Sequence, residues 1–427
     1  MMKTSTAFKL RAWSAGIVAA ALLLAAGAAQ AVPSFARQTG QPCAMCHVGG
    51  FGPQLTDYGI NFKLNAYTMK KAGDDWVPPV AGMVMAGFTH TTKGQDPAEL
   101  DGHSLTGHLK SNNNFTLDQA SLFIAGRIAD HAGIFSQITY DGIAQHTSID
   151  NVDIRVATTT TLGDEHQAIV GASLNNSPGV QDPFNTSPAW AFPYIGSNVA
   201  PGPGAATILD EAFGQKATGA VAYAQLDGAW YAELGTYRMQ TLTLQKDFGI
   251  PQGDRDPGAL RAPLYARFAA RKAFDDSSLN VGLVLFNTGY QPDRTAPQVD
   301  HYRDIGVDAS YRWTGAAGST ATVLGSVIRE TQPAGEITEY TVNGSYFWDG
   351  SYGATLQRFG VNAPGLGSRG TRLQLDWTPW GKTVQSGLFQ PNLRLGLQYT
   401  AYDKLDGETG SAASDANSLF LFAWLAF

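Results

Sequence analysis

The only two cysteines of the chain stand three positions apart and are followed directly by a histidine, in the run Cys43-Ala44-Met45-Cys46-His47. This C-x-x-C-H spacing is the attachment pattern of a c-type haem. On one helical turn the two sulfurs can reach the two vinyl groups of a porphyrin, while the adjacent imidazole comes under the iron as its proximal ligand. The motif therefore predicts one covalently bound haem c, with thioether bonds to Cys43 and Cys46 and with His47 on the iron.

Three other uses of these residues explain the motif less well. A disulfide between Cys43 and Cys46 would be strained by its short loop and leaves His47 without a role. A zinc site would have two thiolates and one imidazole, one ligand short of a closed tetrahedron unless a distant residue joins. A thioredoxin-like redox pair requires a βαβ context, which this sequence does not have.

The second axial ligand of the iron is not fixed by the sequence, although the reduction potential depends on it. Met45 lies inside the attachment motif and cannot fold back onto the distal face of the haem. For each methionine elsewhere the alternative role is to fill space in the packing. The candidates are Met69, Met83, Met85 and His90.

The segment before the motif has the features of an export signal. Lys3, Lys9 and Arg11 precede an apolar run over residues 12–27, and Ala29-Gln30-Ala31 has the small-x-small pattern that a signal peptidase cuts. The apolar run is shorter than the ~20 residues that a membrane-spanning helix needs. Residues 1–31 are therefore predicted to be a signal peptide. Removing 31 of 427 residues leaves 396, and removing three basic residues changes the net charge from −7 to −10.

The composition narrows the class of protein further. The chain has 44% apolar and 15% charged residues, whereas soluble domains carry about 25% charged residues. Scarce charge, plentiful aromatic residues and an acidic balance argue against a disordered or nucleic-acid-binding protein. No other stretch of the sequence is long and apolar enough to predict a transmembrane helix.

From Val80 onward the apolar residues repeat with a period of two, which predicts β-strands. In residues 304–313, for example, apolar and polar positions alternate strictly. The apolar positions of this stretch are Ile305, Val307, Ala309, Tyr311 and Trp313. A soluble sandwich would alternate in the same way, so this pattern alone does not select a membrane barrel.

The connections between the expected strands distinguish better between a soluble sandwich and a membrane barrel. Sixteen strands are expected, starting near residues 80, 115, 131, 147, 166, 216, 229, 261, 277, 299, 318, 335, 350, 369, 391 and 415. Tight turns such as Asp130-His131 and Asp227-Gly228 alternate with longer connections such as 177–215. Short turns alternating with long loops around an even number of strands are typical of an outer-membrane barrel. The connection from Pro379 to Pro391 is long where a turn is expected.

The chain ends on an apolar strand with a terminal aromatic residue, Phe427, which resembles the signal by which outer-membrane barrels are recognised for assembly. Tryptophans at strand ends are expected in the interfacial girdles of such a barrel; these are Trp313, Trp348, Trp377 and Trp380. The predicted fold is thus all-β, an antiparallel outer-membrane β-barrel of about 16 strands over residues 80–427. Residues 32–79 form a short helical haem-binding plug, too small for a core of its own.

The N-terminal region resembles the outer-membrane cytochrome-porin fusion family, whose best-known members oxidise iron. The resemblance rests on residues 33–40, which read PSFARQTG, on the haem motif, and on residues 55–68. It implies a single c-type haem in an N-terminal plug that is inserted into a barrel. Gly49-Gly50 and Asn61 differ from the iron-oxidising members, so the electron donor is left open.

These features predict an outer-membrane cytochrome that moves single electrons from an extracellular donor to a periplasmic acceptor such as a soluble cytochrome. Iron(II) is one candidate donor, which would make the protein an iron(II) oxidase. The alternative is a diffusion porin in which the plug haem is structural or sensory. In that case charges in the lumen would select solutes, namely Arg312, Asp308, Arg372, Asp376 and Arg394. A soluble periplasmic cytochrome with a β-sandwich is a third hypothesis.

Two expected external loops complete the prediction. Residues 175–194 are rich in Pro, Gly and aromatic residues; this loop would fold into the lumen as a constriction, shape a docking surface or simply be solvated. The first external loop carries carboxylates and imidazoles that suit ferrous iron but lack a tight ligand spacing, so a solvated loop is favoured there. The residues concerned are Asp96, Glu99, Asp101, His103 and His108.

Overall fold

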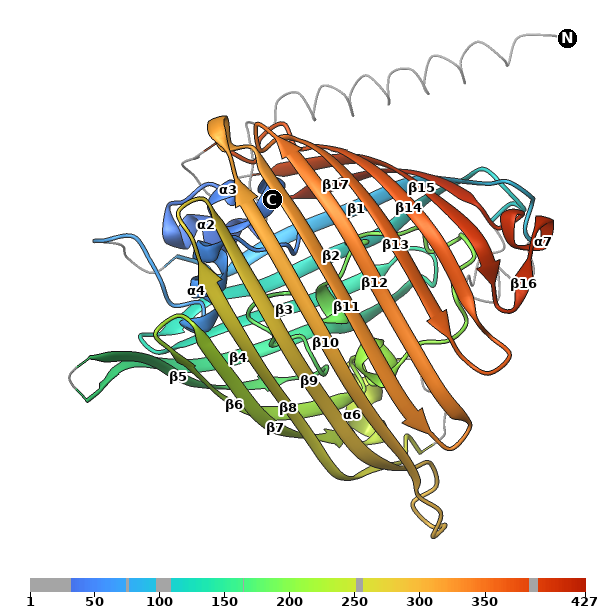
Figure 1. The fold of residues 1–427 in the computed structure, drawn as a ribbon, viewed down its shortest axis with the longest axis horizontal. Helices are drawn as coiled ribbons and strands as arrows, with labels where there is room; N and C mark the ends of the chain where they lie inside the picture. The colour runs from blue at the N-terminus through green and yellow to red at the C-terminus, as the bar shows by residue number, and fades with distance from the viewer. Residues whose placement is uncertain (1–31, 74–76, 97–108, 164, 251–255, 384–390) are drawn as a thin grey trace, which may run out of the picture.

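Sixteen long strands form one closed antiparallel barrel in the computed structural model, which describes residues 32–73, 77–96, 109–163, 165–250, 256–383 and 391–427 (Figure 1). Consecutive strands pair along the chain, and the first strand, β1 (Val80–Thr91), pairs with the last, β17 (Ser418–Ala426). This pairing closes the sheet on itself. The prediction of an antiparallel barrel of about sixteen strands is therefore confirmed.

The other strands lie close to their expected positions, and each long strand begins within three residues of the predicted start. They are β2 (Asn114–Ala129), β3 (Ala132–Asp141), β4 (His146–Leu162), β5 (His166–Asn175), β6 (Ala217–Leu226), β7 (Trp230–Met239), β8 (Ala259–Ala273), β9 (Ser277–Gln291), β10 (Asp300–Thr314), β11 (Thr320–Gln332), β12 (Gly335–Trp348), β13 (Tyr352–Asn362), β14 (Ser368–Trp377) and β15 (Asn392–Leu405). The two-residue strand β16 (Glu408–Thr409) only extends the β15 hairpin beyond the barrel wall.

The two ends of the barrel differ in the length of their connections. Tight turns such as Asp130-His131 lie at the end where β1 begins and β17 finishes, which we call the short-turn end. The opposite, long-loop end carries the long connections together with the short helices α6 (Leu242–Asp247) and α7 (Ser411–Ser414). The exception at the short-turn end is the connection between β14 and β15, and its residue Gly381 accepts a hydrogen bond from the Ala44 N–H.

The outer face of the barrel is apolar, as the alternation predicts. Val307, Leu375 and Leu421 point outward and are each about half exposed, whereas Asp153 and Arg155 point into the barrel and are fully buried. A closed barrel satisfies its backbone hydrogen bonds internally and presents an apolar belt to lipid, which is the architecture of a bacterial outer-membrane protein. None of the helices in the described ranges has the length and hydropathy of a membrane span.

The tryptophans divide between two environments. Trp313, Trp348 and Trp377 are exposed on the outside at the short-turn end, where an interfacial girdle is expected. Trp380 lies in the β14–β15 connection and is partly buried. The last strand is apolar on both faces, as its sequence predicts, and its inward aromatic side chains belong to one buried cluster with Phe51 of the N-terminal segment; these are Phe420, Phe422 and Trp424.

The N-terminal segment lies inside the barrel at its short-turn end (Figure 1). It contains α2 (Pro33–Thr39), α3 (Cys43–Cys46), the 3-10 turn η1 (Val48–Gly50) and α4 (Asp57–Leu64). We call residues 32–73 the plug. One side of the plug is joined to β2 by a hydrogen bond from the Arg127 N–H to Gln38 Oε1. The opposite side packs Ile60 and Leu64 against Tyr231 of β7.

The connection between β5 and β6, residues 176–216, also enters the barrel, so residues 175–194 fold into the lumen and are not simply a solvated loop. We call residues 176–216 the lumen loop; it contains the short turns η2 (Pro188–Trp190) and η3 (Ile208–Ala212). The Phe192 and Ile195 carbonyls accept hydrogen bonds from Gln357 of β13 and Gln398 of β15, at 2.5 and 3.0 Å. The loop therefore crosses the lumen from one wall to the other.

Candidate functional site

The haem motif occupies a single helical turn in the plug. Pro42 starts α3, and the turn ends at His47, whose backbone N–H donates to the Cys43 carbonyl at 2.7 Å. His47 then pairs with Leu55 in an isolated β-bridge. The turn places both sulfurs and the imidazole within one short stretch of backbone, which is the arrangement that attachment of a porphyrin requires.

Desolvation favours the neutral forms of Cys46 and His47. Both cysteines are free thiols, and burial raises the pKa of Cys46 to about 12. Burial also lowers the pKa of His47 to about 4, with the nearby Gly52 backbone opposing the shift. The His47 Nδ1 atom is buried and has no hydrogen-bond partner among the described residues. A neutral imidazole is the form that binds a metal through a ring nitrogen, so these residues fit a haem iron as their ligand.

The other interpretations of the motif find less support. The structure contains no disulfide between Cys43 and Cys46. Within the described ranges, no group of three or more His, Cys, Asp and Glu residues is placed to hold a metal ion. The fourth ligand that a zinc site would need therefore does not come from this part of the chain.

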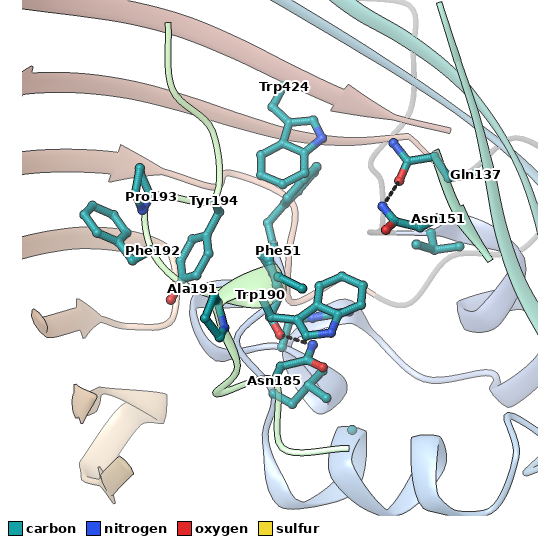
Figure 2. A pocket seen from close by; sticks show the side chains of 18 of the residues that line it. Phe51, Gln137, Asn151, Asn185, Trp190, Ala191, Phe192, Pro193, Tyr194 and Trp424 are labelled. Atoms are coloured by element: carbon teal, nitrogen blue, oxygen red, sulfur yellow. Dashed lines mark hydrogen bonds between the residues drawn. The ribbon is translucent and has the colours of Figure 1, made fainter. Parts of the chain in front are cut away.

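The motif opens onto a cavity of about 630 Å³ inside the barrel. Cys43, Cys46 and His47 line it from the plug, Met85 lines it from β1, and Tyr194 lines it from the lumen loop. Figure 2 shows the aromatic side chains of this cavity, with Phe51 lying between Trp424 and Trp190. Cofactor sites are concave, mostly apolar and roughly 300–1,000 Å³ in volume, so the cavity has the size of a cofactor site, and its lining combines aromatic side chains with a few charged ones.

Helix α4 packs closely against the haem motif at a glycine. The Thr56 side chain caps the helix by accepting from the Gly59 N–H at 3.3 Å, and the Thr56 N–H donates to the Cys46 carbonyl at 2.9 Å. A Cβ atom on Gly59 would lie 2.3 Å from the Cys46 carbonyl oxygen. The absence of a side chain at this position is therefore what lets α4 support the end of α3.

Gly59→Ala is expected to destabilise the plug, because the backbone of α3 or α4 must shift to relieve the contact. Overpacking of this kind costs about 1–3 kcal/mol, which would be measured as a lower urea midpoint of the detergent-solubilised protein. Gly344→Ala is the matched control, since a Cβ there meets nothing within 4 Å. Equal midpoints for the two variants would contradict this account of the packing.

The barrel wall holds the plug on the side of β14 and β15. Asn392 of β15 donates to the Gly50 carbonyl at 2.8 Å, and Arg394 donates to the Phe51 carbonyl at 3.2 Å. Arg394 also forms a buried ion pair with Asp376 of β14 at 2.7 Å. The segment directly after His47 is thus fixed to the wall by polar contacts to its backbone.

The charges expected to select solutes all point inward, but each has a partner. Asp376 and Arg394 pair with each other, and Asp308 pairs with Arg267 of β8 at 2.7 Å. Arg312 donates to the Leu55 carbonyl at 3.0 Å. Arg372 donates to Gln357 at 2.7 Å. Three of these four contacts join residues of the barrel wall to one another, and the contact of Arg312 joins the wall to the plug. These charges therefore take part in packing the interior of the barrel.

Sequence reasoning missed a buried polar cluster that joins the plug, the lumen loop and β4. Arg155 and Asp153 form an ion pair at 2.7 Å with both side chains fully buried. The Tyr67 hydroxyl of the plug donates to Asp153 at 2.6 Å, and Arg155 donates to the Lys63 carbonyl at 3.2 Å. Arg155 also donates to the Gln181 carbonyl of the lumen loop. The only sign in the sequence is that residues 153 and 155 fall on the polar, inward-facing positions of the alternating pattern.

Lys63 is a buried cation between the plug and the lumen loop. Its ammonium donates to the Val180 carbonyl at 2.9 Å and to Asn185 at 2.8 Å, and it lies 4.5 Å from the centre of the Trp190 ring. Burial, and to a smaller extent the charge of Arg155, lowers the pKa of Lys63 to about 7, although nearby carboxylates act in the opposite direction. Lys63 therefore gives up its proton more readily in the folded protein than in the unfolded chain.

This shift makes the stability depend on pH in a defined window. Between about pH 7 and 10 the unfolded chain binds the Lys63 proton and the folded protein does not, so the stability rises with pH by at most about 1.4 kcal/mol per pH unit. We expect the urea midpoint to rise more from pH 7 to pH 10 in the wild type than in Lys63→Met. The control is Lys70→Met, at an exposed position, which should behave as the wild type does. Parallel curves for wild type and Lys63→Met would refute the shift.

The candidate axial ligands occupy different positions. Met83 and Met85 point into the cavity from β1, as expected if Val84 and Phe88 face lipid. His90 is exposed on the outer face and contacts Asn113 at 2.9 Å. Met69 lies at the end of the plug, where its carbonyl accepts from Gln38 at 2.8 Å, and it does not line the cavity.

Several predictions lie outside the described residues. These are the signal peptide, residues 1–31, and most of the weak ferrous site in the first external loop, namely Glu99, Asp101, His103 and His108. Of that set only Asp96 lies within the described ranges.

No protein-family model matches the sequence, and no curated protein matches it. Among solved structures, the chain is similar to an anion-selective porin from Comamonas acidovorans, with 12% identity, a TM-score of 0.45 and coverage of 81% of this chain and 98% of that one. It is also similar to the outer-membrane channel DcaP of Acinetobacter baumannii, with 12% identity, a TM-score of 0.44 and coverage of 82% and 96%. OmpF of Salmonella typhi, in complex with daunomycin, matches with 11% identity, a TM-score of 0.44 and coverage of 82% and 97%. Similarity at this level concerns the fold and not what those proteins bind or transport.

Proposed function

We propose that this protein is an outer-membrane cytochrome that holds one haem c on Cys43, Cys46 and His47 and carries single electrons across the membrane. The observation that carries the proposal is the position of the C-x-x-C-H turn, which opens onto an aromatic cavity of about 630 Å³ within a closed barrel. A haem there would be shielded from lipid by the wall. The N-terminal resemblance to cytochrome-porin fusions agrees with this use of the motif.

The protein's own residues would bind and orient the group. Cys43 and Cys46 would hold it by thioether bonds, and the neutral imidazole of His47 would ligate the iron. Phe51, held by Arg394, and Tyr194 of the lumen loop would cover the ring and exclude water. When bound, the haem supplies reversible one-electron exchange at its iron.

The position of the plug indicates which partner would meet the haem on the periplasmic side. Short turns face the periplasm in bacterial outer-membrane barrels, and the plug lies at the short-turn end. A periplasmic electron carrier such as a soluble cytochrome would reach the haem from this side, and we propose it as the acceptor for electrons from an extracellular donor. Iron(II) is the candidate donor to test first, and its oxidation at this haem would make the protein an iron(II) oxidase.

A donor-by-donor reduction assay on purified outer membranes tests this function. The c-type absorption spectrum is expected to change from oxidised to reduced on adding ferrous iron, and membranes carrying the Cys46→Ala variant should not respond. If the haem stays oxidised with iron(II) but is reduced by another extracellular donor, iron(II) is not the donor, while the proposed electron transfer across the membrane stands. A membrane preparation with no c-type spectrum at all would overturn the proposal.

The second candidate function is a diffusion porin in which the haem is structural or sensory. The lumen loop favours it, because a loop that crosses the lumen can act as a constriction that sets which solutes pass. Liposome swelling with small sugars separates the two functions. Rapid swelling would support the porin, whereas sealed liposomes containing a reducible haem would support the electron conduit.

A further inference from the structure

We propose that Met85 of β1 is the second axial ligand of the haem iron, opposite His47. This inference rests on the proposed function, since it concerns a haem held by Cys43 and Cys46. It follows from the position of each possible ligand around the cavity and from the hydrogen bonds that some of them already make.

The side chains of β1 face the region of the haem motif across the cavity. Phe51, four residues after His47, packs edge-on against Trp424 of β17 with ring centres 4.7 Å apart. Trp424 is the register partner of Met85 in the β1–β17 pair. Phe51, Met85 and Trp424 also belong to one buried apolar cluster. His47 and Met85 therefore contribute to the same cavity from opposite elements, the plug and the wall.

Of the two methionines on this wall, Met83 accepts a hydrogen bond at its sulfur and Met85 does not. The Trp424 indole N–H donates to the Met83 sulfur at 2.7 Å, which holds that thioether against β17. No described residue donates a hydrogen bond to the Met85 sulfur. Met85 is 6% exposed and lines the cavity, so its thioether lies away from bulk solvent on the side of the haem motif. A soft thioether in this state suits an iron ligand of the kind that raises the potential of cytochromes c.

The remaining methionines and histidines in the described ranges are badly placed for this role. Met45 lies within the motif and is 41% exposed, and Met239 packs in a separate cluster with Tyr265 and Phe286. His90 points outward, and none of the other described histidines besides His47 lines the cavity. Lys63 lines it, but its ammonium already donates two hydrogen bonds.

Optical spectroscopy of the oxidised, haem-loaded protein tests the assignment. Ligation of ferric haem iron by methionine gives a weak charge-transfer band at the red end of the spectrum, and we expect the wild type to show it. Met85→Leu should lose this band, convert the iron from low spin to high spin and lower the reduction potential. Met83→Leu, two residues away on the same face, is the matched control and should keep the band.

A second variant guards against a simple folding defect. Met85→His places another strong ligand at the same position and should restore a low-spin iron, with a potential below that of the wild type. Retention of the band in Met85→Leu, or its loss in Met83→Leu alone, would overturn the assignment. Haem staining after denaturation separates this result from failure of the proposed function, because covalent haem persists in every variant if only the distal ligand is misassigned.

Discussion

Cys46→Ala is expected to abolish stable haem attachment, so that haem staining of the denatured protein falls to background. The variant removes one of the two sulfurs that α3 brings to the cavity, and no other cysteine exists in the chain to replace it. The measurement is the haem absorbance per mole of purified barrel.

The matched control lies within the same motif. Met45→Ala changes a side chain that is 41% exposed, and the variant should retain haem at the wild-type level because the C-x-x-C-H spacing is unchanged. Covalent haem surviving in Cys46→Ala would mean that the site is elsewhere. Loss in both variants would point to a folding defect of the plug and not to the loss of a thioether bond.

Arg155→Ala is expected to produce the largest loss of stability, about 3–5 kcal/mol, because it leaves Asp153 as an uncompensated buried charge. Both side chains are fully buried, and the guanidinium lies 5.5 Å from the ring centres of both Tyr67 and Tyr223. The same substitution removes hydrogen bonds to the Lys63 and Gln181 carbonyls. The plug and the lumen loop should therefore both become sensitive to proteases, with a lower urea midpoint.

Arg329→Ala provides the comparison for this prediction. Arg329 forms an ion pair with Glu336 on the outer face, where its side chain is 62% exposed, and exposed pairs contribute at most about 1 kcal/mol. Its urea midpoint should stay near that of the wild type. If Arg155→Ala lowers the midpoint no more than Arg329→Ala does, the buried cluster does not hold the plug in place.

Much of the barrel could be predicted from the sequence because its two faces meet different solvents. Outward residues such as Val307 and Leu375 contact lipid, inward residues such as Asp153 are polar, and this alternation marks each strand. Turn residues such as Asp227-Gly228 then mark where strands end. The alternation ends at β17, an apolar strand whose Trp424 points inward, because the lumen there holds a packed segment of protein and not water.

The interior could be predicted only in part. The motif Cys43–His47 is local, so its residue spacing is enough to propose a haem. Which wall it faces depends on contacts between residues far apart in the chain, such as Asn392 with Gly50. The path of the lumen loop likewise depends on hydrogen bonds from Gln357 and Gln398 that no local pattern encodes. The structure reduces four candidate axial ligands to two and leaves the haem itself as a proposal.

The enclosure of the haem motif has a consequence for biogenesis. Cys43 is 3% exposed, and the plug is held at once by strands from the beginning of the barrel, such as β2, and from its end, such as β15. Once β1 has paired with β17, the Cys43 sulfur is enclosed by the plug and the wall and is no longer presented to an attachment enzyme. A haem on Cys43 and Cys46 would therefore have to be attached while the chain is still an unfolded intermediate in the periplasm. Haem attachment to the N-terminal segment would therefore have to come before β17 pairs with β1 and closes the barrel.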